Sequence, residues 1–278
     1  MKPNVSAADG PSAITPSLWW VGRSAWGGLP PLTPSFDGNI FLLKGDRYDV
    51  LIDAGGGPSI KDLQHNIRLA GSTPERIREI WITHCHCDHF LGAGPWAAKY
   101  PRTICCLSKV GLTLLRRKDY RLTGLYLGPG ALKLPKKLQP LEDGSVLRCP
   151  PFELRVEATP GHVPDGLCFR GQVDGLELLV TGDTVIGDQH IPGTGLQKGM
   201  IGWICGSWMS NMRSYRQSLA RLAATRPDLL LPGHGLPQAG PAARSSLKNA
   251  LRRVERLMAF PDFLNLGPYY SFSAFAPK

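Results

Sequence analysis

The stretch 83–89, THCHCDH, places three histidines and one aspartate within six positions. In extended backbone, alternate side chains point the same way, so His84 and His86 face one side together. Where the chain then turns, Asp88 and His89 can aim at a neighbouring point. Imidazole nitrogens and a carboxylate form a ligand set suited to Zn²⁺, and also to Fe or Mn. One such histidine could simply be buried and hydrogen-bonded, but so dense a group favours metal binding.

The two cysteines inside this stretch permit a second interpretation, a zinc site that uses Cys85 and Cys87. The alternation that brings His84 and His86 together points both thiols to the opposite side. We therefore interpret the two cysteines as packing residues.

Three later motifs place further candidate ligands at the ends of apolar strands. Each motif is weak evidence alone, because a polar residue after a strand is often a turn residue. In open α/β sheets, however, sites gather beyond strand ends. The motifs therefore predict that His162, Asp183 and His234 converge on one point. They are Thr159-Pro160-Gly161-His162, Leu179-Val180-Thr181-Gly182-Asp183-Thr184 and Leu231-Pro232-Gly233-His234-Gly235.

Hydrophobic periodicity along the chain predicts an alternation of strands and helices. Short Val/Ile/Leu-rich runs bounded by Gly and Asp predict strands, and a spacing of three to four residues predicts helices. With no internal repeat and no linker, the pattern favours one α/β domain over residues 1–278. The predicted strands are 17–22, 38–44, 49–53, 78–83, 152–159, 167–170, 176–183 and 229–231, and the predicted helices are 60–70, 215–224 and 241–260.

Three segments do not follow this periodicity. Residues 1–16 are small and polar, so we expect a loose N-terminal arm. Residues 108–140 combine basic residues with Leu, Gly and Pro, and residues 184–215 are rich in Gly, Trp and Met. Without a clean period, the last two segments are expected to cover a pocket rather than to build the core.

Composition gives expectations for the cellular compartment and for the class of substrate. The formal net charge of +10 favours an anionic small-molecule substrate, but basic residues not interleaved with aromatics disfavour nucleic acid. Seven cysteines without a C-x-x-C pair indicate a reduced chain, which predicts a cytoplasmic location. The N-terminus carries no apolar signal region, and no apolar run is long enough to span a membrane. Composition leaves the oligomeric state open.

Four motifs, in their order along the chain, resemble those of the metallo-β-lactamase-fold superfamily. They are H-x-H-x-D-H, P-G-H, G-D and P-G-H-G. The resemblance extends to Asn39, to Asp53-Ala54-Gly55-Gly56 and to Ser218-Leu219-x-x-Leu222, and it covers roughly residues 36–236. It implies a four-layer αββα sandwich with two metal ions, expected to be Zn²⁺, at one edge. The implied ligands of metal one are His84, His86 and His162, those of metal two are Asp88, His89 and His234, and Asp183 bridges the ions.

This resemblance implies a metal-dependent hydrolase in which a hydroxide bridging the two ions attacks the substrate. Asp88 would bind metal two and act as the catalytic residue that orients the hydroxide. Asp183 resembles the glyoxalase II, lactonase and phosphodiesterase branches, because true β-lactamases of this fold usually carry Cys or Ser at the bridging position. An ester-like bond, such as a thioester or lactone, is therefore the expected target.

Several alternative activities fit the same motifs. The segment Thr184–His190 departs from the glutathione-binding segment of glyoxalase II, and no pocket tyrosine of the lactonases can be assigned between Tyr126 and Tyr215. A ribonuclease Z-like nuclease or phosphodiesterase would need residues 108–140 as an RNA-grasping arm. A mono-iron persulfide dioxygenase is a further alternative within the fold. A binding module without catalysis is disfavoured, because all seven ligand positions are filled.

Apolar side chains gather in the expected pocket loop. They could form a small separate hydrophobic core or an apolar wall for an acyl or aryl group. His65 and His190 are interpreted as surface histidines. The apolar residues of the loop are Met200, Trp203, Trp208, Met209 and Met212.

Overall fold

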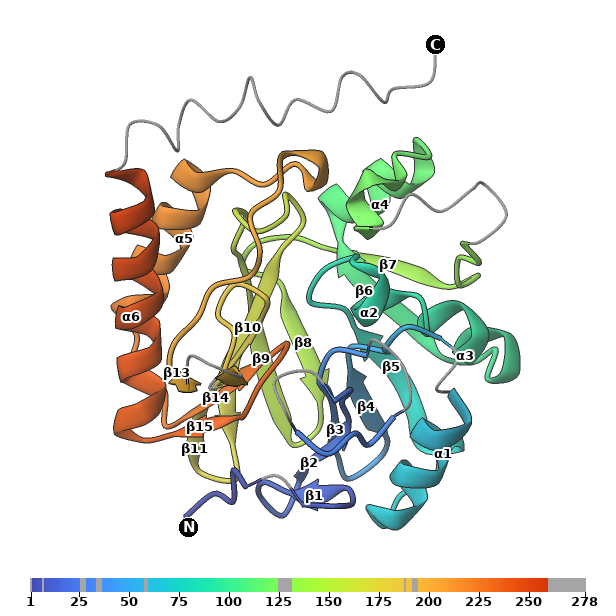
Figure 1. The fold of residues 1–278 in the computed structure, drawn as a ribbon. Coiled ribbons are helices and arrows are strands. Elements are labelled where there is room, and N and C mark those ends of the chain that lie inside the picture. Colours follow the sequence, from blue (N-terminus) through green and yellow to red (C-terminus); the bar gives the residue numbers. More distant parts are fainter. Residues whose placement is uncertain are drawn as a thin grey trace.

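The computed structural model describes residues 2–6, 8–25, 29–33, 37–57, 60–124, 132–187, 189–191 and 195–259. Within them, two mixed β-sheets lie face to face with helices on both outer sides (Figure 1). In that view α1 (Ile60–Leu69) and α3 (Ala93–Lys99) flank one sheet, and α5 (Met212–Ala223) and α6 (Pro241–Met258) cover the other. This arrangement is the predicted αββα sandwich.

The first sheet has the order β1-β2-β3-β4-β5-β6-β7. Neighbours are antiparallel from β1 to β4 and parallel from β4 to β7. Parallel neighbours matter for the site, because their carboxyl ends meet at the same edge of the sheet. The strands are β1 (Ser12–Ala13), β2 (Leu18–Gly22), β3 (Ile40–Lys44), β4 (Asp49–Ile52), β5 (Ile77–Trp81), β6 (Ile104–Ser108) and β7 (Leu138–Leu141).

The second sheet has the order β15-β14-β11-β10-β9-β8. Its strands are antiparallel except for the parallel pair β11 and β14. A short hairpin, β12 (Gln189–Ile191) with β13 (Gly195–Gln197), lies outside both sheets. The strands are β8 (Val146–Cys149), β9 (Phe152–Ala158), β10 (Leu167–Val173), β11 (Leu176–Gly182), β14 (Leu229–Pro232) and β15 (Gln238–Ala239).

The alternation of side chains along each strand separates three apolar clusters. Phe41 and Leu43 of β3 point into the cluster between the sheets, whereas Leu42 points into the cluster under α1 and α3. In β11, Val180 points between the sheets and Leu179 points towards α5 and α6. Strands apolar on both faces are what a sheet buried on both sides requires, so the continuous apolar runs of these strands fit the four layers.

The remaining helical elements lie near the metal-ligand edge or connect the strands. They are η2 (Pro74–Arg76), α2 (Cys87–Phe90), α4 (Lys109–Arg116), η3 (Tyr120–Thr123) and η4 (Gly206–Trp208). No helix in the described part of the chain is long and apolar enough to cross a membrane.

Two of the expected irregular segments differ from their predictions. In the N-terminal arm, β1 pairs with β2, and Ile14 is buried between the sheets. In segment 108–140, Leu112 and Leu122 belong to the cluster under the first sheet, and β7 extends that sheet. Isolated apolar residues on a short helix or strand leave too little pattern to be recognised in sequence. That residues 1–278 form one domain stays a prediction.

Candidate metal centre

All seven predicted ligands lie just beyond strand ends at one edge of the sandwich. His84 and His86 follow β5, and α2 carries Asp88 and His89 in its single turn. The other three, His162, Asp183 and His234, follow β9, β11 and β14. Because β9 and β11 run in the same direction and β14 is parallel to β11, these three ends meet opposite the end of β5.

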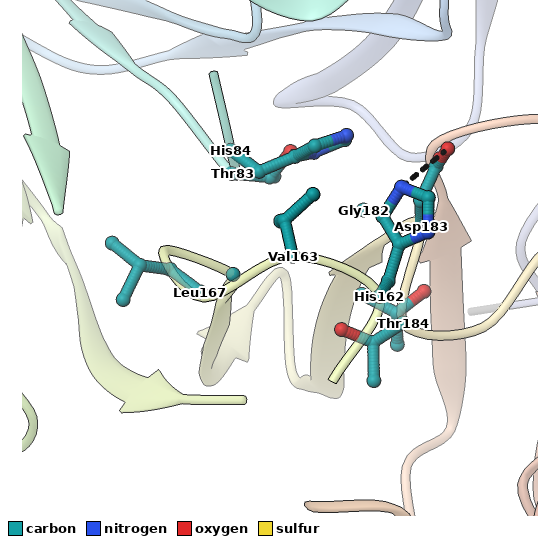
Figure 2. A pocket seen from close by; sticks show the side chains of 10 residues that line it. Thr83, His84, His162, Val163, Leu167, Gly182, Asp183 and Thr184 are labelled. Atoms are coloured by element: carbon teal, nitrogen blue, oxygen red, sulfur yellow. Dashed lines mark hydrogen bonds and ion pairs between the residues drawn. The ribbon is translucent and has the colours of Figure 1, made fainter. Parts of the chain in front are cut away.

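The structure brings these residues together in two groups whose candidate ligand atoms lie within 4.8 Å of one another. The first group consists of His84, His86, His162 and Asp183, and the second consists of Asp88, His89 and His234. Figure 2 shows part of the first group, with His162 turned towards Asp183 and His84 extending from the opposite side.

Asp183 lies between the two groups. Its Oδ2 is 3.7 Å from Nε2 of His162 and 3.5 Å from Nε2 of His234, and its Oδ1 is 3.5 Å from Nε2 of His89. The side chain is about 8% exposed. One carboxylate therefore faces histidines of both groups, which is the arrangement that bridging of two cations requires.

Hydrogen bonds on the far side of the rings fix which imidazole nitrogen is available. His89 Nδ1 donates to Asp53 Oδ2 at 2.8 Å, and His162 Nδ1 donates to the carbonyl of Trp203 at 2.8 Å. The Thr83 hydroxyl donates to Asp53, so its oxygen is left to accept from His84 Nδ1 at 3.1 Å. Each ring then directs its Nε2 towards the centre, as metal ligation requires.

Asp53 is the functional residue to which the sequence alone gave no role. Besides His89, its carboxylate accepts from Thr83 N at 2.7 Å and from Thr83 Oγ1 at 2.8 Å. It thus orients one histidine of each group, His89 directly and His84 through Thr83. The sequence feature that could have identified Asp53 is the Asp-Ala-Gly-Gly turn after a strand. In that turn Asp53 adopts a φ of 62°, a conformation uncommon outside glycine.

A polar segment before β3 holds the loops of the second group in place. The Asn39 amide donates to the carbonyls of Pro232 and Gly235, each at 2.9 Å, and Gly38 N donates to the Asp88 carbonyl at 2.9 Å. Gly38 lies so close to the His89 ring that any Cβ there would overlap it. Gly38 and Asn39 therefore hold both parts of the chain that carry the second group, the turn at Asp88 and the loop around His234.

The two groups differ in their electrostatics. In the first group, burial and neighbouring imidazoles lower the pKa of His84 and His86, and burial lowers that of His162. In the second, burial opposes protonation, but Asp88, Asp183 and Asp53 more than offset it and raise the pKa of His89 to about 10. Asp183 and Asp88 likewise raise the pKa of His234 despite its burial.

The residues fit a metal site on an observation independent of family. Nε2 of His84 is buried and has no hydrogen-bond partner among the described residues. Nε2 of His86 is likewise buried and has no hydrogen-bond partner among the described residues. Buried polar nitrogens without a partner are costly, and a cation beside them would satisfy both. The donor set of imidazoles and carboxylates suits Zn²⁺ and related ions.

The cysteines of the 83–89 stretch stay outside both groups, as expected. Cys85 is buried in the cluster under the first sheet, and neither Cys85 nor Cys87 belongs to a candidate ligand group among the described residues. Burial raises the pKa of the Cys87 thiol to about 12, so it is protonated near neutrality.

The tyrosine considered for substrate binding is structural. Tyr215 is fully buried, and its hydroxyl is 3.0 Å from the carbonyl of Asp183, 2.8 Å from that of Thr184 and 2.9 Å from Gly202 N. It therefore joins the loop before α5 to the Asp183 turn instead of lining a pocket. Tyr126 and the side chain of His190 lie outside the described residues.

Aromatic side chains of segment 184–215 lie beside the first group. The Trp208 ring packs edge-on against His86, with ring centroids 4.8 Å apart at 70°. Trp203 is about 63% exposed, while its carbonyl accepts from His162. On the other side, Gly124 at φ 68° approaches the His86 ring. Apolar surface thus borders the ligands.

Three comparisons place this geometry among known proteins. The chain is 27% identical over 226 residues to the probable metallo-hydrolase YflN of Bacillus subtilis, covering 75% of this chain and 83% of that protein. It is 31% identical over 193 residues to the probable polyketide biosynthesis zinc-dependent hydrolase BaeB of Bacillus velezensis, covering 68% and 71%. A HARLDQ-motif mutant of a metallo-β-lactamase from Cronobacter sakazakii matches with a TM-score of 0.67 at 21% identity, covering 90% and 97%.

The structural match, at that identity, shows a shared fold and leaves the reaction open. The family model described as the metallo-beta-lactamase superfamily matches residues 34–234, which include all seven candidate ligands. With the two hydrolase-named relatives, this match identifies the chain as a metal-dependent hydrolase of the metallo-β-lactamase superfamily.

Proposed function

We propose that this chain is a two-zinc hydrolase that cleaves an ester-like bond, a thioester or a lactone, in a small-molecule substrate. The observation that carries the proposal is the position of Asp183, whose two carboxylate oxygens lie within 3.7 Å of histidines from both groups. A carboxylate placed between two complete ligand sets supports two ions per chain over one.

His84, His86 and His162 would hold one ion, and Asp88, His89 and His234 the other, with Asp183 contacting both. Ions held by these residues would lower the pKa of a bound water and polarise the oxygen of the scissile carbonyl. The zinc-dependent relative in Bacillus velezensis supports zinc as the metal, while the same donors also accept Fe or Mn.

Asp88 is the residue that we assign to the attacking water. Its Oδ2 lies 3.0 Å from His234 Nε2, and its side chain is about 19% exposed, compared with about 8% for Asp183. Asp88 therefore reaches the open side of the centre, where it can orient the water and accept its proton. The buried Asp183 is left to contact both ions, and the buried Asp53 to hold His89 and Thr83 in position.

An apolar acyl or aryl group on the substrate fits the surroundings of the first group. Trp208 packs against His86, and Trp203 exposes most of its ring to solvent. An aspartate at the bridging position favours the ester-hydrolysing branches of the fold over the β-lactamases. The net charge of +10 favours an anionic substrate, and we keep nucleic acid and membranes outside the proposal.

We further propose a reducing compartment, the cytoplasm. All seven cysteines are free, and five of them are buried. Burial raises the pKa of the Cys105 and Cys106 thiols above the usual range, so these groups are inert packing residues without need of a disulfide.

Metal analysis of the purified protein, followed by an activity panel, tests this function. We expect two equivalents of zinc and turnover of a thioester or a lactone, with little hydrolysis of nitrocefin or bis-p-nitrophenyl phosphate. A single iron with oxygen uptake on a persulfide would instead establish the dioxygenase alternative. Efficient hydrolysis of the phosphodiester by the zinc-loaded protein would replace the proposal with a phosphodiesterase.

A further inference from the structure

Behind the first ligand group, the buried carboxyl of Asp165 contacts the 83–89 stretch. Its Oδ2 accepts from the backbone N–H of Cys85 at 3.0 Å, and the side chain is about 1% exposed. Cys85 lies between His84 and His86, and Asp165 follows His162 in the same loop. The contact therefore joins two chain segments that together carry three candidate ligands.

A second hydrogen bond connects the same two segments on the other side of His84. Leu167 N donates to the Thr83 carbonyl at 2.8 Å. His84 is thus flanked at both neighbouring residues by contacts from the loop that carries His162. Of the two contacts, the one through Asp165 depends on a side chain and can be removed by substitution.

Helix α4 approaches this contact through a glycine. A Cβ on Gly111 would lie 2.8 Å from Asp165 Oδ2 and 3.0 Å from Cys85 Sγ. Glycine in the middle of a helix is unfavourable relative to alanine, so its presence is explained by the close approach of this carboxyl and thiol. Helix α4, the 83–89 stretch and the loop that carries Asp165 therefore meet at Gly111, where no side chain larger than hydrogen fits.

Asp165 differs from the other buried carboxylates that hold the fold together. Its Oδ1 is buried and has no hydrogen-bond partner among the described residues. By contrast, Asp49 at the far end of β4 is equally buried, and its oxygens accept from Gly45 N, Ser72 and Arg76. A half-paired carboxyl adds little net stability, which points away from a purely stabilising role.

We propose that Asp165 is a positioning residue that holds the His84–His86 segment against the His162 loop, so that the first ligand group is already assembled before the ion binds. The inference rests on the proposed function, since it assigns the preorganisation of one of its two ion sites. It predicts a selective effect on the affinity for the ion in the first group. Hydrogen bonds of this supporting kind commonly change metal affinity by about 10- to 100-fold.

The test is a zinc titration of the metal-stripped full-length protein against a chromophoric chelator. Asp165→Ala should weaken one of the two zinc equivalents by about 10- to 100-fold and leave the other nearly unchanged. Asp165→Asn, whose side-chain oxygen can still accept from Cys85 N, should restore most of that affinity. Gly111→Ala should weaken the same equivalent, although Gly111 touches no ligand, because its Cβ would displace the carboxyl.

Asp49→Ala is the matched control. It removes an equally buried carboxylate, so it should lower the stability of the fold while leaving both zinc affinities at the wild-type value. A ligand-field spectrum of the cobalt-substituted Asp165→Ala protein should also differ from wild type, which a loss of stability alone would not cause.

Wild-type zinc affinity in Asp165→Ala would overturn the positioning role, and so would a loss in Asp165→Asn as large as in Asp165→Ala. If Asp165→Ala does not fold, Gly111→Ala decides, and unchanged affinity there overturns the proposal. Failure of the wild-type protein to bind zinc at all would instead contradict the proposed function, so the two failures are distinguishable.

Discussion

The two ligand groups share one edge of the sandwich but lie in opposite electrostatic surroundings. The first is dominated by imidazoles, whose pKa values are lowered by burial and by one another, so they are neutral and have free lone pairs near neutrality. In the second, carboxylates raise the pKa of His89 to about 10 and also raise that of His234. An ion entering the second group must displace protons, whereas the first is ready to bind.

The convergence of ligand side chains and their readiness to bind an ion are therefore separate properties. The same strand-end geometry produced both groups, but the number of carboxylates around each set their charge. Asp183 is a candidate ligand of the first group, but its oxygens lie 3.5 Å from His89 and His234 of the second group and raise the pKa of both. The following substitutions test how independent the two groups are.

Asp183→Ala should have the largest effect, because it removes the carboxylate whose oxygens lie near histidines of both groups. We expect turnover to fall by at least about a thousand-fold and the bound metal to fall below one equivalent, measured by steady-state kinetics and elemental analysis. If one equivalent and substantial turnover remain, Asp183 does not bridge and the two groups work separately.

His86→Ala and His234→Ala separate the groups, since each removes a ligand from only one. Each variant should lose about one metal equivalent and at least about a hundred-fold in turnover. His65→Ala, which removes an exposed histidine on α1, is the control and should keep both equivalents and full activity. Loss of both metals in either ligand variant would show that the groups fill only together.

Asp53→Ala should affect both groups by a smaller amount, because Asp53 orients His89 directly and His84 through Thr83. Supporting carboxylates of this kind are worth about 10- to 100-fold in metal affinity. Chelator competition would measure the two affinities separately. An effect limited to one equivalent would show that the contact through Thr83 carries no weight.

Asp165→Asn should have the smallest effect on turnover but a clear one on stability. Burial raises the pKa of Asp165 to about 6 from an ordinary 3.8. The folded state therefore prefers the neutral acid, and its stability is retained below pH 3.8 and lost as the pH rises through about 6. The difference of roughly two pKa units corresponds to about 3 kcal/mol at most.

Urea unfolding of the metal-stripped proteins at several pH values checks this sign. The wild-type protein should lose stability relative to Asp165→Asn between about pH 4 and pH 7, and the gap should then stay constant. A gap that does not change with pH would mean that Asp165 titrates normally and that its surroundings are more polar than the structure indicates.

Much of the fold followed from local pattern. The strands around β3, β4, β9, β11 and β14 and the helices around α1, α5 and α6 lie within a few residues of the predicted ranges, because the strands are short apolar runs ended by turn residues and the helices have apolar residues three to four apart. The strand β7 and the helix α4 were missed. Their few apolar residues show no recognisable pattern in the sequence. In the folded chain α4 packs under the first sheet and β7 extends that sheet.

Residue type and motif position indicate which seven side chains could bind metal, because ligand chemistry is fixed by residue type and the motifs place each residue at a strand end. The family resemblance implied how the seven divide, whereas the residues that surround and support them are known only from the packed structure. The roles inferred for Asp53, Asp165 and Tyr215 depend on partners 30, 80 and 31 or 32 residues away along the chain. No local periodicity records contacts over such distances, because they exist only once segments far apart in the sequence have packed together.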